Sequence, residues 1–391
     1  MSSTDRVVIA GAARTPLGSF QGKLKSFSAP QLGSAAIRAA LERAGLKSEF
    51  ADEVFMGNVL PAGLGQAPAR QAALGADMPH ATPCTTVNKV CGSGMKAAIL
   101  GHDAILAGSA SVVVAGGMES MSKAPYLLSK ARGGYRMGHS EIYDHMFLDG
   151  LQNAYDGALM GTFAEDTAEK YQFTRTAQDE FALASLSRAT HAAEEGIFTR
   201  EIVPLRVDGE LVDRDEGPTR ADPIKIPKLK PAFREGGTVT AANSSSISDG
   251  AAALVLMGER AADARAIRPL ARIVGHATHA QEPAWFTTAP VGAITKLLER
   301  VGWSPDDVDL YEINEAFAVV TLVAMRDLAL PHDKVNVHGG ACALGHPIGA
   351  SGARIIVTLL NALETRGLKR GVASLCIGGG EATAMAVERI V

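Results

Sequence analysis

The sequence predicts an α/β protein, because short apolar runs typical of buried strands alternate along the chain with segments of helical periodicity. A glycine-rich turn between a strand and a helix occurs at 91–94 and again at 345–352, and the strand at 112–117 is echoed at 373–380. Two such pairs in the same order indicate duplicated half-domains rather than chance similarity between βα turns. The 391 residues, 47% of them apolar, suffice for two or three domains with more than one core.

The first third of the chain alternates regularly between the two kinds of segment. Apolar runs closed by glycine or polar residues predict strands, and apolar residues three or four positions apart predict helices. Arg14, Thr15 and Pro16 predict a turn after the first strand. We expect strands at Val7–Ala10, Glu53–Asn58, Cys84–Val90 and Ser111–Ala115, and helices at Ala35–Arg43, Ala67–Leu74 and Met95–Leu106.

The pattern changes between residues 121 and 246, where irregular, proline-bearing stretches surround one clear amphipathic helix, Arg175–Glu194. So long an irregular stretch is improbable inside one compact layer, which predicts an insertion between two cores. Alternation then resumes. We expect strands at Ala251–Met257, Arg272–Val274, Asp309–Ile313, Val335–Val337 and Ala373–Ile377, and a helix at Phe317–Met325.

Composition excludes several classes of function. The formal charge of −4 offers no basic field for a nucleic-acid backbone. The chain has neither a phosphate-binding loop nor a dinucleotide fingerprint, which argues against ATP and NAD. No apolar stretch reaches the ~18 residues of a membrane helix, and the amino terminus, MSSTDRVVIAGA, does not resemble a signal peptide. We therefore expect a soluble cytoplasmic protein that does not bind membranes.

Neither the cysteines nor the histidines predict a metal site. The four cysteines, at 84, 91, 342 and 376, form no Cys-x-x-Cys pair, so reduced thiols are expected rather than disulfides or a zinc knuckle. His276 and His279 share a short segment, but no carboxylate or cysteine accompanies them at ligand spacing. We therefore predict no metal.

Three residues in glycine-rich contexts are candidates for chemistry. Cys91 lies where a strand passes into a helix, a position that exposes a side chain and favours the thiolate, although it could equally be a small buried hydrophobe. His346 lies between glycine-rich loops. It could face a cleft, or it could have only a structural role. Cys376 ends a buried strand before Gly378, whose amide could help to bind an anion, or it is an ordinary core cysteine.

Asn314 and the serines near residue 245 can also be interpreted as purely structural residues. Asn314 follows a strand and precedes a helix, so by itself it is best interpreted as an N-cap. Ser244, Ser245, Ser246 and Ser248 could be plain turn residues. None of these residues indicates a function by itself, and only their combination with the other motifs does.

Four segments resemble, in order, the four signature blocks of the thiolase family. The blocks are Asn88–Met95 (NKVCGSGM), Asn314–Ala318 (NEAFA), Gly345–Gly352 (GHPIGASG) and Cys376–Gly380 (CIGGG). The resemblance extends over essentially the whole chain, from Arg14-Thr15-Pro16 to the final strand. Four separate blocks in the right order are very improbable as coincidence.

The resemblance implies a thiolase fold, with two duplicated βαβαβαββ halves in a five-layered αβαβα arrangement and a loop domain inserted in the first half. The first half would be residues 1–120, completed by 247–268, and the second half 269–391. Residues 121–246 would form the loop domain that covers coenzyme A. A homo-oligomer, dimer or tetramer, is also implied.

The resemblance also implies catalytic roles. Cys91 would be the nucleophile that takes an acyl group, with its proton passing to His346, and Cys376 would remove a proton from the methyl carbon of a second acetyl-CoA. His346 and a water held by Asn314 match the family's oxyanion hole for the enolate, and the amides of Cys91 and Gly378 match the one for the tetrahedral intermediate. Coenzyme A would be a substrate and product, with no metal and no permanently bound cofactor.

Coenzyme A contacts are implied chiefly from the inserted segment. Ser245 resembles the serine that hydrogen-bonds pantetheine, and Arg220 resembles the arginine near the adenine and phosphate end. Four further residues match apolar positions along the pantetheine channel, with core packing as the alternative: Leu151, Met160, Phe233 and Phe317.

Two positions bear on acyl length. Leu159 precedes Met160-Gly161, where enzymes specialised for acetoacetyl-CoA synthesis carry a histidine. Phe286, in Pro283–Phe286, resembles the phenylalanine of short-chain thiolases that tolerate a 2-methyl branch. We predict a preference for acetoacetyl-CoA and close relatives.

The implied activity is that of an acetyl-CoA C-acetyltransferase, which joins two acetyl-CoA by a ping-pong Claisen condensation and catalyses the reverse thiolysis. The alternatives are a broader-range 3-ketoacyl-CoA thiolase of fatty-acid β-oxidation and a non-catalytic acyl-CoA-binding protein. Ketosynthase-like and hydroxymethylglutaryl-CoA synthase-like enzymes lack a second catalytic cysteine at position 376. A Cys/His/Asn hydrolase fits the residue types alone, but would act without free coenzyme A.

Overall fold

The central sheet of this computed structural model, which describes residues 6–390, contains two sets of strands in matching order. The first set runs β1 (Val7–Arg14), β10 (Ser248–Gly258), β5 (Val112–Ser120), β3 (Glu53–Gly57) and β4 (Cys84–Val87). The second runs β11 (Ala271–Ala280), β14 (Glu381–Arg389), β13 (Arg370–Ile377) and β12 (Leu310–Ile313). The first five residues, on which the expected absence of a leader partly rests, lie outside the described range.

Strand direction repeats along with strand order. In each set the outer pairing is parallel, β3 with β5 and β12 with β13, whereas β10 with β5 and β14 with β13 are antiparallel. The two sets join edge to edge through only two residue pairs, Val8 with Arg272 and Ile9 with Ala271. The repeated order and direction confirm the predicted duplication.

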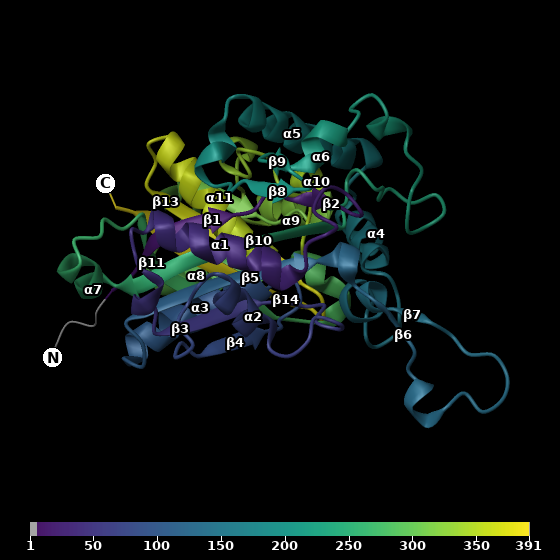
Figure 1. Cartoon of the computed structure of the whole chain (residues 1–391). Helices are drawn as coiled ribbons and strands as arrows, with labels where there is room; N and C mark the ends of the chain where they lie inside the picture. Colours follow the sequence, from purple (N-terminus) through teal and green to yellow (C-terminus); the bar gives the residue numbers. More distant parts are fainter. Residues whose placement is uncertain (1–5, 391) are drawn as a thin grey trace.

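Helices form three layers around and between the two strand sets (Figure 1). Helices α3 (Ser93–Ala107) and α11 (Ser351–Thr365) contact strands of both sets, including β5 and β10 of the first and β14 of the second. Helices α1 (Ala29–Arg43) and α2 (Pro68–Gly75) cover the outer face of the first set. Helices α8 (Ala289–Val301) and α9 (Ala318–Asp327) cover the second.

Burial along the elements reflects this layering. Every residue of α11 from Ser351 to Leu363 is buried, as expected for a helix with sheets on both sides. Strands β5 and β10 are buried along their whole length, which explains their continuous apolar runs. A Ser28–Gln31 capping box begins α1, six residues before the predicted start of that helix.

Glycines let the amino-terminal ends of the two central helices touch. A Cβ atom on Gly352 would lie 2.3 Å from the Met95 nitrogen, and one on Gly94 would lie 2.8 Å from the Ala353 nitrogen. Only glycine permits such close approach of two backbones. Because Cys91 precedes α3 and His346 precedes α11, this contact brings the two signature blocks together.

The predicted strand Val335–Val337 does not form. Only an isolated parallel bridge between Tyr311 and Val335 remains where the second set would have its fifth strand. Asn336 has a left-handed backbone (φ 48°), and its side chain hydrogen-bonds both the amide and the carbonyl of Ile313. Hydrogen bonds from the Asn336 side chain thus take the place of backbone pairing between strands. The second half departs from the βαβαβαββ repeat at this point.

Between β5 and β10 the chain leaves the sheet. The predicted helix Arg175–Glu194 is present as α5, but the expectation of a single helix in this segment is wrong. Helix α4 buries a mixed set of residues in which polar side chains interrupt the apolar ones: Gly161, Phe163, Ala164, Glu165, Thr167 and Ala168. The segment contains β6 (Tyr126–Leu127), β7 (Tyr143–Asp144), α4 (Met160–Tyr171), α5 (Arg175–Glu194), β8 (Leu205–Val207), β9 (Glu210–Val212) and α6 (Glu216–Arg220).

Smaller elements and boundaries complete the description. Strand β4 ends at Val87, three residues before the predicted end at Val90. No helix within residues 6–390 is long and apolar enough to cross a bilayer. The remaining short elements are β2 (Gly18–Ser19), α7 (Glu259–Ala264) and α10 (Ala341–Leu344).

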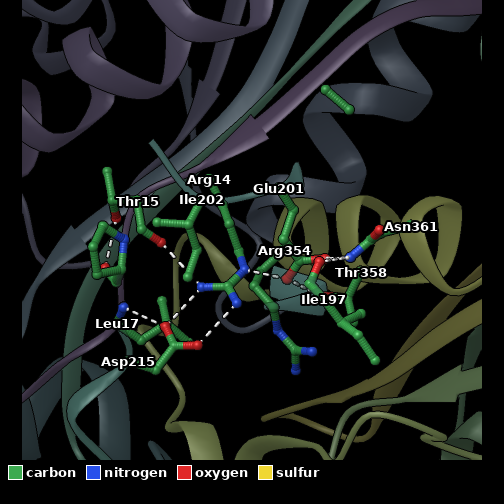
Figure 2. Close-up of polar contacts among 12 residues, drawn as sticks. Arg14, Thr15, Leu17, Ile197, Glu201, Ile202, Asp215, Arg354, Thr358 and Asn361 are labelled. Atoms are coloured by element: carbon green, nitrogen blue, oxygen red, sulfur yellow. Dashed lines mark hydrogen bonds and ion pairs between the residues drawn. The ribbon is translucent and has the colours of Figure 1, made fainter. Parts of the chain in front are cut away.

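Strand β1 continues through Arg14, where the sequence predicts a turn, because the Arg14 side chain is held in the interior. Its guanidinium pairs with Glu201 at 2.5 Å and with Asp215 at 2.7 and 2.9 Å (Figure 2). Both carboxylates come from the segment between β5 and β10. The buried ion pairs therefore attach that segment to the sheet, and a lone charge would be costly there.

Candidate active site

One cavity brings most of the predicted site residues together. Its volume is 380 Å³, and its walls are formed by loops of both halves and by the segment between β5 and β10. Of the predicted residues, only Cys376, Asn314 and Arg220 are not on its surface. Those that line it are Cys91, Leu151, Leu159, Met160, Phe233, Ser245, Phe286, Phe317, His346 and Gly378.

Cys91 lies on a sharp turn between β4 and α3. Val90, immediately before it, has a left-handed backbone (φ 46°), which is strained for a β-branched residue. Gly92 is the N-cap of α3, and a Cβ atom there would lie 2.3 Å from Cδ1 of Ile377. The turn thus directs Cys91 into the cavity and sets its backbone against the end of β13.

Burial raises the pKa of the Cys91 thiol to about 11, although hydrogen bonds from the Gly378 and Cys91 amides act in the opposite direction. The expectation that the helix terminus favours a thiolate is therefore wrong. Loss of solvent outweighs two amide dipoles. Cys91 rests as a thiol, so it needs a base to become a nucleophile.

His346 has the properties of such a base. Its Nδ1 lies 2.5 Å from Oγ of Ser351, and that hydroxyl donates to the Pro347 carbonyl oxygen at 3.0 Å, so Nδ1 carries the proton. Its Nε2 is buried with no hydrogen-bond partner in the described chain. Burial, and then the charge of Arg354, lower the pKa of His346 to about 3, which keeps the imidazole neutral near pH 7.

Asn314 lies directly behind His346. Its Nδ2 is 3.4 Å from His346 Nδ1, and its Oδ1 accepts a hydrogen bond from Nη2 of Arg354 at 3.2 Å. Asn314 is not a helix cap, because Phe317 occupies the N-cap position of α9. Arg354, which the sequence reading missed, is 1% exposed and pairs with Glu312 at 2.8 Å. In the sequence, only the position of Arg354 shortly after His346 could have indicated a role near the site.

Cys376 is fully buried near the end of β13, in a cluster with Phe286 and Phe317. Burial raises the pKa of the Cys376 thiol well above its usual range. Cys376 directly precedes Ile377, whose Cδ1 packs against Gly92 next to Cys91, although of the two cysteines only Cys91 lies on the cavity surface.

Glu119, a residue that the sequence reading missed, supports the cavity floor. Its carboxylate accepts amide hydrogen bonds from Val59, Leu60 and Gly349 and one from the Asn58 side chain, at 2.7 to 3.2 Å. Burial raises the pKa of Glu119 to about 7. The carboxylate joins the loop after β3 to the loop that carries His346. Nothing in a one-dimensional pattern reveals that a strand-end glutamate will be enclosed in this way.

Aromatic rings form one wall of the cavity. The Phe317 ring lies 5.9 Å from that of Phe233 and 6.4 Å from that of Phe286, both in edge-on arrangements. A Cβ atom on Gly161 would lie 2.3 Å from Phe233, so the start of α4 packs directly on this wall. The wall is rigid and apolar, as is usual for small-molecule sites.

Arg220 lines a second cavity, of 360 Å³, which shares Ala241 and Ser246 with the first. Lys225 and Asp222 also line it. The two cavities thus adjoin, and Arg220 supplies positive charge beyond the apolar one, whereas Lys225 pairs with Asp222 at 3.1 Å. The order of features, reactive groups, apolar walls and then positive charge, suits an elongated ligand with an anionic tail.

The family descriptions "Thiolase, N-terminal domain" and "Thiolase, C-terminal domain" match residues 7–260 and 267–389. Acetyl-CoA acetyltransferase 2 of Arabidopsis thaliana is 53% identical over 389 residues, covering 98% of this chain and 96% of the relative. Acetyl-CoA acetyltransferase of Pseudomonas aeruginosa is 50% identical over 389 residues, covering 98% and 99%.

Solved structures agree with these matches. The Acat5 thiolase of Ascaris suum in complex with coenzyme A has a TM-score of 0.95 at 43% identity, over 98% of this chain and 100% of that one. The acetyl-CoA acetyltransferase of Syntrophomonas wolfei has a TM-score of 0.96 at 40% identity, over 99% and 100%. Across nearly its full length, therefore, this chain belongs to the thiolase family.

Proposed function

We propose that this chain is an acetyl-CoA C-acetyltransferase, which condenses two acetyl-CoA to acetoacetyl-CoA and coenzyme A and catalyses the reverse thiolysis. The observation that carries the proposal is the placement of Cys91 and His346 on one apolar cavity, with Cys376 buried two residues before Gly378, which lines the same cavity. The acetyl-CoA acetyltransferases that are about half identical over nearly the full length support the same activity.

In the first half-reaction, the Cys91 proton passes to Nε2 of His346 and the sulfur attacks the thioester carbonyl of acetyl-CoA. The C–S bond to coenzyme A breaks, and the departing thiolate takes the proton of Cys376. The raised pKa of Cys376 keeps its thiol protonated before acyl transfer, so the proton is in place, although it also makes the thiol a weak acid. The products are acetyl-Cys91, free coenzyme A, protonated His346 and a Cys376 thiolate.

In the second half-reaction, the Cys376 thiolate removes a proton from the methyl carbon of a second acetyl-CoA. The resulting carbanion attacks the acetyl carbonyl on Cys91, a C–C bond forms, and the Cys91 sulfur leaves and recovers its proton from His346. A thiolate disfavoured by burial is a strong base, which matches the weak acidity of the methyl group. Protons balance over the cycle, and the kinetics are ping-pong.

Negative charge develops twice on carbonyl oxygens, and two groups of donors are available. The amides of Cys91 and Gly378, which already hydrogen-bond the Cys91 sulfur, would stabilise the tetrahedral intermediate on Cys91. Protonated His346 would stabilise the enolate, together with the water that the resemblance to the family assigns to Asn314. Each such donor is worth about 10² to 10³ in rate.

Coenzyme A would extend from this floor along the aromatic wall toward Arg220. Pantetheine would lie against Leu151, Met160, Phe233 and Phe317, with Ser245 beside it, and the phosphates would reach Arg220 and Lys225. The inserted residues 121–246 would thus form the domain that covers the ligand. Coenzyme A is substrate and product here, with no permanently bound group required.

Phe286 favours short acyl groups, because its ring lines the 380 Å³ cavity, whereas Leu159, also on the cavity wall, stands where enzymes specialised for acetoacetyl-CoA synthesis carry a histidine. We propose acetoacetyl-CoA and its 2-methyl derivative as the preferred substrates for thiolysis. Rates across 3-ketoacyl-CoAs from C4 to C16 test this assignment. A maximum at C10 or longer would instead support a broad-range thiolase of fatty-acid oxidation.

A homo-oligomer is part of the proposal. The segment around β6 and β7 projects from the rest of the chain (Figure 1), and it exposes Tyr126 (68%), Met137 (98%) and Ile142 (63%). Apolar side chains on a projecting arm suit burial against a second copy. A cytoplasmic location fits the mechanism, because Cys91 and Cys376 must both remain reduced, and both are free thiols here.

The decisive experiment is incubation with acetyl-CoA followed by intact-mass measurement and a thiolysis assay with acetoacetyl-CoA. We expect one acetyl adduct, lost on Cys91→Ala, and thiolysis that requires free coenzyme A. Binding of acetyl-CoA with neither adduct nor turnover would support a non-catalytic acyl-CoA-binding protein and overturn the proposal.

A further inference from the structure

Three potential metal ligands converge on the side of the fold away from the cavity. Helix α3 supplies His102 and Asp103, and strand β11 supplies His276. Oδ1 of Asp103 lies 3.0 Å from Nδ1 of His102 and 2.9 Å from Nε2 of His276. The three ligand atoms all lie within 4.8 Å of one another.

Both imidazoles direct a nitrogen at the same carboxylate oxygen. Their rings are nearly perpendicular, at 88°, with centroids 5.0 Å apart, so they approach that oxygen from two directions. An ion at bonding distance from all three atoms, about 2.0 to 2.2 Å, fits between them after shifts of a few tenths of an ångström. Two imidazoles and one carboxylate form a ligand set that binds Zn²⁺ and related ions.

Electrostatics around the three residues favour a cation. Asp103 lies within five residues of the carboxyl end of α3, where the backbone carbonyls make the helix pole negative and a carboxylate is unfavourable. Arg300 carries a positive charge that opposes a bound cation. Its guanidinium is close to the site, since it donates a hydrogen bond to the His276 carbonyl at 2.6 Å.

We propose that His102, Asp103 and His276 form a binding site for one divalent transition-metal ion, Zn²⁺ in the first instance. The two imidazole protons that now point at Asp103 would move to the other ring nitrogens, so binding needs no net proton release from neutral histidines. Asp103 is 51% exposed in its side chain, which leaves an entry path and an open coordination position for water.

The site would join the two halves of the fold. His102 and Asp103 belong to the first half, whereas His276 belongs to the second. Cys91 precedes α3 at its other end, and eleven residues of helix span about 16 Å, so the ion would not reach the thioester. Its effect would be structural, since an ion that binds only the folded chain stabilises it.

Local spacing could not reveal this cluster. His276 and His279 are three residues apart on one strand, so their side chains point to opposite faces, and Nε2 of His279 bonds Gln281 instead. The carboxylate that the sequence lacks near His276 comes from position 103, on another element. The exclusion of metal binding for His276 on local spacing is therefore not supported by the fold.

The test is equilibrium dialysis of the full chain against Zn²⁺ and, separately, Co²⁺, with bound metal counted by elemental analysis and melting temperature recorded. We expect one equivalent per chain, a higher melting temperature with metal, and a Co²⁺ spectrum free of thiolate-to-metal charge-transfer bands. The matched variants are His276→Gln and Asp103→Asn, with His279→Gln on the same strand as control.

Each site variant should weaken binding by more than about 10-fold, because even partners of ligands contribute about 10–100-fold. His279→Gln should bind like the parent, and acetoacetyl-CoA thiolysis without metal should be unchanged in all three, which verifies folding. Absence of binding in the parent overturns the proposal. So does binding that survives in both site variants, and thiolate bands would then assign it to the cysteines.

Discussion

Nη2 of Arg354 donates to Oδ1 of Asn314 at 3.2 Å, while Nη1 of the same guanidinium pairs with Glu312. Because the amide oxygen of Asn314 is occupied by Arg354, its NH₂ group is the end that faces His346. Arg354 therefore orients a donor without touching the cavity itself. A buried arginine fork holds such an orientation better than a single point charge.

Arg354→Lys should lower kcat for condensation by about 10-fold or more with little change in KM, because the lysine keeps the charge beside Glu312 but not the second hydrogen bond. Steady-state kinetics and melting temperature would be measured together. Arg366→Lys, on the exposed end of the same helical region, is the control. A loss of stability with unchanged kcat would mean that Arg354 is only structural.

The two cysteines should differ in their effect on each half-reaction. Cys91→Ala should abolish acetylation and both overall directions, because no other thiol faces the cavity. Cys376→Ala should still allow Cys91 to be acetylated, more slowly, while condensation is lost. Rapid mixing with acetyl-CoA followed by intact-mass measurement separates the steps, and equal loss of the adduct in both variants would contradict the assigned roles.

Phe286 should limit acyl length. Phe286→Ala removes a ring that is 3% exposed at the cavity wall and should raise activity toward C6 relative to C4 3-ketoacyl-CoA by about 10-fold, since one methylene is worth about 10–200-fold in an apolar pocket. It should also cost about 3–5 kcal/mol of stability. Phe163→Ala is the matched control, because that ring packs on Phe286 but does not line the cavity.

A shift in the C6 to C4 ratio that is equal in Phe163→Ala and Phe286→Ala would argue against a direct role in selectivity. It would show that loosening of the aromatic cluster, rather than the ring at the wall, sets the acyl length. The ratio is best measured at substrate concentrations well below KM, where it reports kcat/KM.

His338 should make the fold sensitive to acid. Burial lowers the pKa of His338 to about 4, so below its unfolded value of about 6.5 the unfolded chain takes up a proton that the folded chain does not. This contribution to stability is present above pH 6.5 and is lost as the pH falls toward 4. His338→Gln should therefore gain about 1.4 kcal/mol relative to the parent between pH 7.5 and 5.5.

Urea unfolding of the parent and of His338→Gln at several pH values measures this difference directly. Comparing the two chains cancels the opposite effect of Glu119 and Glu312, whose pKa values burial raises to about 7 and about 8 and whose contribution is lost as the pH rises. A pH-independent difference would show that His338 has the same pKa in the folded and the unfolded chain.

Some of the fold follows from the sequence because strand and helix signals are local. The alternation of β3, α2, β4 and α3 is visible in short windows, and the helix at Arg175–Glu194 has its predicted bounds. Val335–Val337 is apolar enough for a strand, but the left-handed turn at Asn336 prevents one. The buried face of helix α4 mixes Phe163 with polar residues such as Glu165 and Thr167, so an apolar pattern alone does not mark it.

The sequence by itself determined the order of the signature blocks around Cys91, Asn314, His346 and Cys376. These blocks indicate the family, because each motif consists of residues that are neighbours along the chain. Only the tertiary structure decided that Cys91 rests as a thiol, that Arg354 orients Asn314, and that His102, Asp103 and His276 meet. The physical reason is that desolvation and contacts between distant elements depend on what surrounds a side chain in space. The surroundings of a side chain cannot be deduced from the spacing of residues along the chain.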